Sequence, residues 1–344
     1  MKWWKILAIV IILYVHIAGL LIPIGIGINS VSPYQVTGGE KVNLNIGTYN
    51  ADIKNGEGVR AWLKYDDDHL ITSKRIFSEA PTKLMAEFIL PASLPDGKKG
   101  SDLSLIIDFE DQGTAVSPGA VYYTGTEKSS VEEWMPLELS DLSVVANLHF
   151  PYRSILIETI RNTYFHVSLW LSMMILLTGA VVFAIRNLRS KNLLDDSRSS
   201  ALTEVGFLFG IFGVTTGMIW AEYTWGKAWS WDIKQITTAI ALLIYSAYFL
   251  LRNSMEDPYK KSRISSIFNI FAFIALIPLL YILPRMSESL HPGSGGNPAL
   301  GGEDLDSTMR MIFYPAVIGW ALVGLWMSEI LSKYKTVKIL SLKS

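Results

Sequence analysis

The chain of 344 residues contains no cysteine. Disulfide bridges, thiolate metal sites, thiol nucleophiles and thioether-linked prosthetic groups are therefore excluded. Charged residues are also scarce: they make up 18 % of the chain, against roughly 25 % in soluble domains, and the formal net charge is −1. Without a basic run or a positive net charge, the sequence offers no basis for nucleic-acid binding.

Long apolar runs are what the sequence has in abundance. Each of six runs comes close to the roughly 20 residues that cross the hydrocarbon core of a bilayer. The first run follows a short basic start and is longer than the apolar core of a cleaved signal peptide, so we expect an uncleaved anchor over residues 1–28. The predicted fold class is an all-α polytopic membrane protein with six transmembrane helices. The runs cover residues 6–28, 167–185, 205–221, 233–251, 264–283 and 311–331.

Lysine and arginine are distributed unevenly among the loops. The segments 186–198 and 252–263 carry four positive residues each, whereas the loops 222–232 and 284–308 carry one each. The positive-inside rule then places both termini and the two basic loops in the cytoplasm. Residues 333–344 accordingly form a basic cytoplasmic tail, and the segment between the first two runs lies outside.

That outer segment has the pattern of a β domain. Residues 58–65, 83–90 and 102–109 alternate with the period of a strand, and turn signals such as Pro95-Asp96-Gly97 separate them. Short strands at this spacing predict an inserted extracytoplasmic β-sandwich of six or seven strands over residues 29–126.

Two further features of the outer segment have plain interpretations. Asp66-Asp67-Asp68-His69 could hold a metal, but a polar hairpin turn is the favoured interpretation. Residues 127–165 are predicted to be a periplasmic linker with amphipathic portions that lie near the outer membrane face.

Ionisable side chains are missing from the middle of every run except the first, which contains His16. Carboxylates inside the membrane mark ion and proton pathways, so their lack argues against an ion-coupled transporter. A membrane b-type cytochrome needs pairs of histidines within its helices, and one lone His16 cannot supply them. We expect His16 to make a polar contact between helices.

The most unusual segment spans residues 216–232, TGMIWAEYTWGKAWSWD. Four tryptophans, Trp220, Trp225, Trp229 and Trp231, fall within twelve residues on a predicted outer loop between two runs. An aromatic belt at the membrane interface explains one or two tryptophans at a helix end. Four of them, ending in Asp232, could instead form a rigid apolar platform for a large planar ligand.

The motif Trp225-Gly226-x-x-Trp229-x-Trp231-Asp232 resembles the "WWD" signature of the heme-handling membrane proteins of cytochrome c maturation, which include the CcmC and CcsA types. Thr216-Gly217-x-x-Trp220 is similar to the pattern that precedes the signature in the CcmC type. The resemblance covers about residues 155–331, and the first run by position. Six runs without paired intramembrane histidines favour the CcmC type.

The resemblance implies a set of site residues. In the family, two outer histidines are the axial ligands of heme iron; His166, in Tyr164-Phe165-His166-Val167, and His291, in Ser289-Leu290-His291-Pro292-Gly293, are similar to them. The four tryptophans and Asp232 then contribute to the binding surface. Arg161 and Lys234 are candidates for pairing with the heme propionates, or else for contact with lipid headgroups. His149 is the nearest rival ligand.

This chain departs from the family pattern in three places. The β domain replaces a compact first outer loop, so its role cannot be carried over. Ser168 stands where the family usually has proline. Lys234 stands where the CcmC type usually has arginine, which is similar to the CcsA type.

The resemblance therefore implies a non-enzymatic, heme-binding component of cytochrome c biogenesis in a bacterial inner membrane. Residues 166–332 form its five-helix heme-handling domain, with heme b as transient cargo. Its expected partners are a periplasmic heme chaperone, ABC-transporter subunits and membrane lipid. Two alternatives stay open: a CcsA-type component that attaches heme to apocytochrome, and a non-heme envelope sensor or scaffold.

Overall fold

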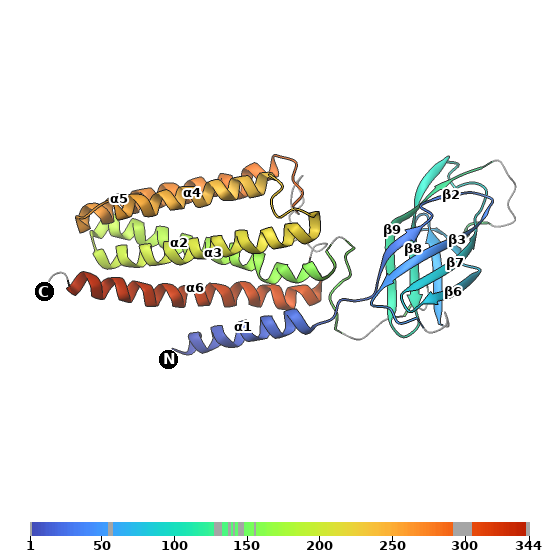
Figure 1. The fold of residues 1–344 in the computed structure, drawn as a ribbon, viewed down its shortest axis with the longest axis horizontal. Coiled ribbons are helices and arrows are strands. Elements are labelled where there is room, and N and C mark those ends of the chain that lie inside the picture. The colour runs from blue at the N-terminus through green and yellow to red at the C-terminus, as the bar shows by residue number, and fades with distance from the viewer. Residues whose placement is uncertain are drawn as a thin grey trace. The chain divides into compact units, whose positions relative to one another are not determined.

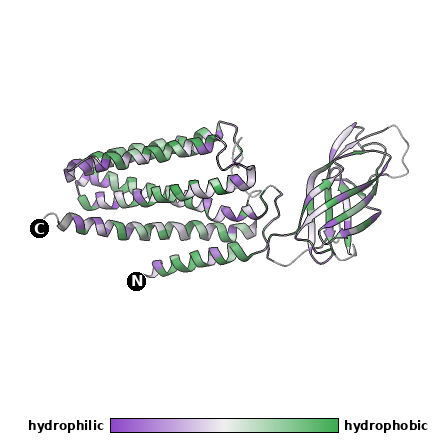
Figure 2. Ribbon diagram, in the orientation of Figure 1, coloured by the Kyte–Doolittle hydropathy of each residue, from purple (hydrophilic) through white to green (hydrophobic). Residues whose placement is uncertain are grey.

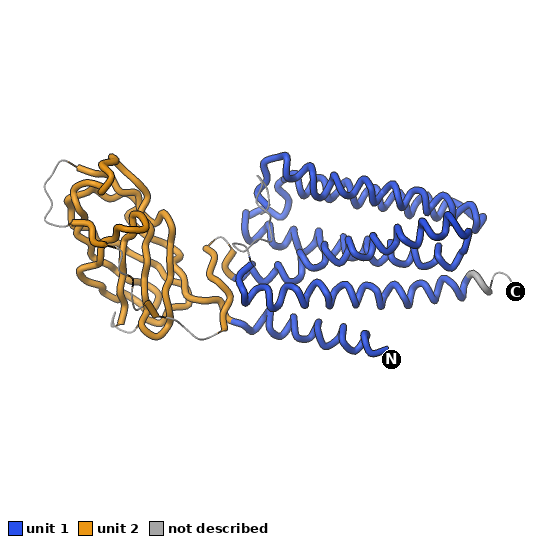
Figure 3. Tube along the Cα trace, turned by 180° about the vertical axis from the view of Figure 1, so that it is seen from behind, with its two compact units in different colours: residues 1–22, 158–344 blue, residues 23–157 orange. Residues whose placement is uncertain are grey.

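The computed structural model describes residues 2–53, 58–126, 133–136, 139, 142–143, 148–154, 156–291 and 305–341. The chain forms two compact units (Figure 3). Met1–Ile22 and Glu158–Ser344 make the helical unit, and Pro23–Ile157 makes the β unit.

The helical unit contains six long helices (Figure 1). All six are long and apolar enough to cross a membrane, which confirms the predicted number. Hydrophobic residues line most of their length, and polar residues gather at the helix ends (Figure 2). The helices are α1 (Trp3–Leu21), α2 (His166–Ser190), α3 (Leu193–Trp225), α4 (Ile233–Asn253), α5 (Pro258–Ile277) and α6 (Ser307–Ser341); a 3₁₀ helix (Ile157–Tyr164) precedes α2, and π and 3₁₀ turns (Pro278–Ile282, Leu283–Arg285) extend α5.

Two helices are much longer than the apolar runs that predicted them. Helix α3 has 33 residues, or about 50 Å at 1.5 Å per residue, and α6 has 35. Helix α6 therefore includes most of the predicted basic tail. The apolar runs reveal only the part of each helix that lies in hydrocarbon, because helical backbone continues into water wherever no residue ends it.

The first helix ends at Leu21, seven residues before the end of the predicted anchor. Pro23 restricts Ile22 to an extended conformation, and Ile22 has φ −62° and ψ 123°. The apolar sequence continues because Ile24 and Ile28 are buried in the β unit. Hydropathy alone cannot distinguish these two kinds of burial.

The β unit has two sheets that enclose one hydrophobic core, as predicted for a sandwich. Its predicted strands are present as β4, β7 and β8. One sheet has the order β1-β3-β7-β6 and the other β10-β5-β4-β8-β9-β2. The strands are β1 (Gly27–Ser32), β2 (Gln35–Thr37), β3 (Lys41–Tyr49), β4 (Val59–Lys64), β5 (His69–Thr72), β6 (Arg75–Ala80), β7 (Lys83–Ile89), β8 (Gly100–Phe109), β9 (Gly113–Thr124) and β10 (Met135–Pro136).

The β unit is larger than the predicted insertion and has more strands than the six or seven expected. Strand β1 comes from the end of the predicted anchor, and β10 comes from the predicted linker and pairs with β5. Ser143, also in that linker, donates to the buried carboxylate of Asp108. The predicted linker is therefore divided: its described residues up to Ile157 belong to the β unit, and those from Glu158 on belong to the helical unit. Within residues 127–147, the structure describes only 133–136, 139 and 142–143.

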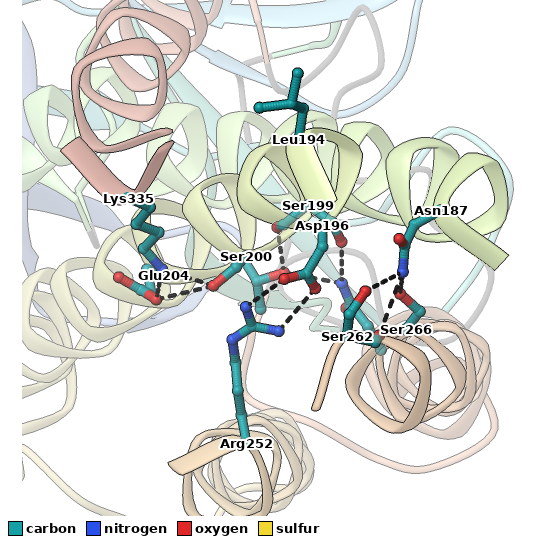
Figure 4. A network of polar contacts seen from close by, with 12 residues as sticks. Asn187, Leu194, Asp196, Ser199, Ser200, Glu204, Arg252, Ser262, Ser266 and Lys335 are labelled. Atoms are coloured by element: carbon teal, nitrogen blue, oxygen red, sulfur yellow. Dashed lines mark hydrogen bonds and ion pairs between the residues drawn. The ribbon is translucent and has the colours of Figure 1, made fainter. Parts of the chain in front are cut away.

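A buried polar network ties the helices together at the end of the bundle that contains the α2–α3 and α4–α5 turns (Figure 4). Arg252 of α4 forms two hydrogen bonds with Asp196 of α3, at 2.9 and 2.7 Å. Lys335 of α6 pairs with Glu204 and donates to Ser200 at 2.6 Å. Asn187 of α2 donates to serine hydroxyls of α5. These pairs fix the register of the helices, because a buried charge that loses its partner is strongly unfavourable.

Candidate heme site in the helical unit

The tryptophan-rich segment is half helix, not one loop as predicted. Helix α3 continues to Trp225 and ends because Gly226 adopts a left-handed conformation with φ 71°. A glycine in this position is a common helix C-cap. Trp220 and Trp225 therefore project from the last turns of α3, and only residues 226–232 form the loop before α4.

His166 is the first residue of α2, and α3 holds its ring. The ring Nδ1 lies 2.8 Å from the carbonyl oxygen of Gly213 and 3.2 Å from the hydroxyl of Thr216. A carbonyl only accepts hydrogen bonds, so Nδ1 carries the proton and the lone pair lies on Nε2. The edge of the ring packs on Gly217, where a Cβ would lie only 2.7 Å from Cε1. Gly217 thus provides the space that the imidazole occupies.

His291 is held by a carboxylate instead. Its Nδ1 lies 2.8 Å from Oδ1 of Asp232. Asp232 also accepts from the hydroxyl of Ser289, at 3.0 and 2.8 Å, and from the backbone N–H of Leu290 at 2.9 Å. It caps α4 as well, by accepting from the N–H of Lys234 at 2.9 Å. One carboxylate therefore orients His291, the chain before it and the start of α4.

Tryptophan rings border His291. The ring centre of Trp225 lies 4.7 Å from that of His291, nearly edge-on, and Trp220 lies at 5.9 Å. The ring centres of Trp229 and Trp231 lie 5.8 Å apart. Trp231 is 74 % exposed, and its backbone has a φ of 60°. A left-handed backbone is unfavourable for a bulky residue and marks a candidate functional position.

The two histidines meet the same face of α3. Gly213, Gly217 and Trp220 follow one another at intervals of four and three residues, which places them on one side of the helix. His166 contacts the two glycines, and His291 contacts the tryptophan one turn later. The fold therefore brings together the two histidines, two of the tryptophans and Asp232.

The electrostatics of this group favour a neutral imidazole at His291. Burial lowers the pKa of His291, and the charge of Asp232 opposes that effect only in part. Burial would raise the pKa of Asp232, but hydrogen bonds from Leu290, Lys234 and Ser289 outweigh it and lower the pKa. A neutral imidazole beside an ionised carboxylate is the state that binds iron.

The two predicted propionate partners lie in different surroundings. Lys234 lies in the first turn of α4, next to Asp232. The Arg161 guanidinium donates from Nη1 to the carbonyl oxygens of Gly19 and Ile22, both at 2.8 Å, and from Nε to Glu158 at 2.6 Å. Arg161 therefore ties the end of α1 to the helix before His166, a role that the sequence did not reveal.

The other described histidines make different contacts. His149 belongs to the β unit and contacts the backbone of Phe150. His16 donates to the carbonyl of Ile12 and packs against Phe165 and Trp320, a contact between helices as expected. Asp66 accepts from His69 in the β4–β5 hairpin turn, and the described residues contain no group of three or more His, Asp or Glu that could hold a metal ion.

Comparison with known proteins identifies the family of the helical unit. The family model for heme exporter protein C (CcmC) matches residues 142–340, more than half of the chain. Heme exporter protein C of Bradyrhizobium diazoefficiens is 26 % identical over 168 residues, 48 % of this chain and 62 % of that protein. That of Paracoccus denitrificans is 23 % identical over 174 residues, 48 % of this chain and 69 % of that protein.

A second group of relatives is similar over shorter stretches. Cytochrome c biogenesis protein CcsA of Prochlorococcus marinus is 37 % identical over 79 residues, 23 % of this chain and 25 % of that protein. The chain thus spans only part of the length of these relatives: 62 % and 69 % of the two heme exporter C proteins and 25 % of the CcsA protein. The family match, together with six helices that can cross a membrane, shows that the chain is a multi-pass membrane protein of the heme exporter protein C family.

Proposed function

We propose that this protein binds heme between His166 and His291, beside the tryptophan cluster, and delivers it during cytochrome c biogenesis. Heme is cargo here, and no residue of the site makes or breaks a bond of the porphyrin. The proposal includes an outer-face site with both termini in the cytoplasm, a periplasmic heme chaperone as acceptor, and ABC-transporter subunits as partners.

The observation that carries the proposal is the paired imidazole geometry. Each ring has its Nδ1 engaged as a donor, so each has its lone pair on Nε2, the nitrogen that binds iron. Two imidazoles saturate the axial positions of heme and prevent oxygen chemistry, which suits carriage. The tryptophan rings supply apolar, planar surface for the macrocycle, and Lys234 supplies a cation for a propionate.

The direct test is the visible spectrum of the detergent-purified protein. We expect the sharp bands of six-coordinate, bis-imidazole heme. His166→Ala and His291→Ala should each weaken heme binding, and added imidazole should partly restore the bands. His149→Ala is the matched control and should leave the spectrum unchanged. Loss of heme in His149→Ala with retention in His166→Ala would contradict the assignment of the ligand pair.

Similarity to CcsA proteins supports a second candidate, in which the chain takes part in attaching heme to apocytochrome. The two candidates differ in the acceptor. A chaperone loaded with heme in a reconstituted mixture supports delivery, whereas direct formation of the thioether product supports attachment. A purified protein without heme, which also fails to bind added heme, would favour a sensor or scaffold instead.

We further propose that the β unit recruits a partner and is not part of the heme site. It has its own closed hydrophobic core, and exposed insertions commonly serve recognition. Replacing residues 31–126 with a Gly/Ser linker should leave heme bound through His166 and His291 but slow its transfer. Loss of heme in a variant that still inserts in the membrane would contradict this separation of roles.

A further inference from the structure

The two proposed ligands differ in what holds them. The Nδ1–H of His291 donates to an ionised carboxylate, that of Asp232. The Nδ1–H of His166 donates to a neutral backbone carbonyl, that of Gly213, with the hydroxyl of Thr216 nearby. This difference in the second hydrogen bond changes the donor strength of the imidazole at its other nitrogen.

Both carboxylate oxygens of Asp232 already accept hydrogen bonds from the protein. Its side chain is 3 % exposed and accepts hydrogen bonds from four groups: the Lys234 N–H, the Ser289 hydroxyl, the Leu290 N–H and the His291 ring. These donors fix both oxygens. Asp232, predicted from the sequence to bind the cargo directly, therefore acts through His291 as a positioning residue.

A carboxylate draws the Nδ1 proton more strongly than a carbonyl does, because a charge-assisted hydrogen bond is roughly twice as strong as a neutral one. The imidazole then gains imidazolate character and becomes a stronger donor to iron, which favours the ferric state. We propose that the pair is unequal: Asp232 makes His291 the stronger ligand, and His166 is the one that yields first when an acceptor takes the heme.

This inference rests on the proposed function and adds an order of events. In the exchange, the bond from iron to Nε2 of His166 breaks and a bond from iron to a ligand of the acceptor forms. The electron pair of each bond stays on its ligand, so the iron keeps its oxidation state and no further reactant is needed. His291 holds the heme until the acceptor is engaged.

The test uses the reduction potential of heme bound to the full-length protein in detergent. Asp232→Asn keeps the shape but removes the charge, and we expect the potential to shift to a more positive value. Ser289→Ala removes a donor from Asp232 and concentrates the carboxylate charge on His291, so we expect a shift to a more negative value. Thr215→Val is the matched control: it lies next to Thr216 on α3, but its hydroxyl donates to the carbonyl of Ile211 at 3.0 Å, so the potential should stay nearly unchanged.

Shifts of opposite sign in the reduction potential distinguish this role from a simple loss of structure, because general loosening of the site would shift the potential of both variants in the same direction. Heme dissociation supplies a second readout: His291→Ala should release heme about ten-fold faster than His166→Ala, within the 10–100-fold range of outer-shell effects. Equal release rates, or shifts of the same sign in Asp232→Asn and Ser289→Ala, would overturn the inference while leaving heme binding intact. A wild-type protein that binds no heme would overturn both proposals.

Discussion

Gly217 is the position where a single methyl group should test the site most directly. A Cβ added at Gly217 would lie 2.7 Å from Cε1, 3.2 Å from Nδ1 and 3.5 Å from Nε2 of His166. The imidazole cannot move aside without breaking its 2.8 Å hydrogen bond to Gly213. Gly217→Ala should therefore displace the ring or push α2 away from α3.

The expected effect follows from the energy of such overpacking. An extra methyl in a tightly packed site costs about 1–3 kcal/mol. If that strain falls on the heme-bound geometry, affinity for heme should drop by about 5- to 150-fold, since each 1.4 kcal/mol is a factor of ten. The measurement is the heme content and dissociation rate of the purified variant, taken from its visible spectrum.

Gly210→Ala is the matched control, because it adds the same methyl to the same helix two turns earlier. There the new Cβ would meet Leu242 Cδ2 at 2.9 Å and Met173 Sδ at 3.0 Å, the ends of flexible side chains that can move. We expect Gly210→Ala to keep its heme. Equal heme affinity in Gly217→Ala and the wild type, in protein that is inserted and folded, would refute the placement of His166 against α3.

Two further predictions concern the stability of the β unit and of the helical unit, each taken by itself. Hydrogen bonds from Arg60, Thr114 and Ser143 outweigh burial and hold the pKa of Asp108 below its ordinary 3.8. The ionised Asp108 therefore stabilises the β unit above pH 3.8, and this stabilisation is lost as the pH falls through the lowered pKa of the folded protein. Hydrogen exchange of β4 and β8, corrected for intrinsic rates, should show this loss of protection at low pH in the wild type and not in Asp108→Asn. The same pH dependence of protection in both proteins would contradict this prediction. Arg252→Met leaves the buried carboxylate of Asp196 without its cation and should lower the free energy of unfolding by about 3–5 kcal/mol. In thermal melts, the double variant Arg252→Met with Asp196→Leu should recover most of that stability. A double variant no more stable than the single one would argue against an ion-pair clamp.

The bundle and most of the sandwich could be predicted from the sequence because their signals are local. Apolar runs of membrane length and strands of period two each depend on neighbouring residues alone. The errors occur where burial in lipid and burial in protein give the same signal: Ile24 and Ile28 are buried in the β unit, not in lipid. Pro23 restricts the residue before it to an extended conformation and so accounts for the end of α1, which hydropathy does not indicate.

The residues of the candidate site could be named from the sequence, but the contacts among them could not. His166, His291 and the tryptophans could be named from a resemblance, whereas the Asp232–His291 contact joins residues 59 positions apart. Gly213 and Gly217 allow side chains of α2 to pack closely against α3. No local feature of the sequence indicates that Trp170 packs at Gly213 and His166 at Gly217, because a missing side chain does not reveal what fills its space.

Helix α3 explains why these residues need so long and continuous an element. Its polar first turns are fixed by Arg252 and Lys335, and its last turns present Gly213, Gly217 and Trp220 to the two histidines. Because its 33 residues form one helix, the ion pairs at one end and the imidazole contacts at the other belong to the same rigid body. Because α3 ends at Gly226, in the middle of the tryptophan-rich segment, Trp220 and Trp225 stay on the helix, whereas Trp229 and Trp231 belong to the loop.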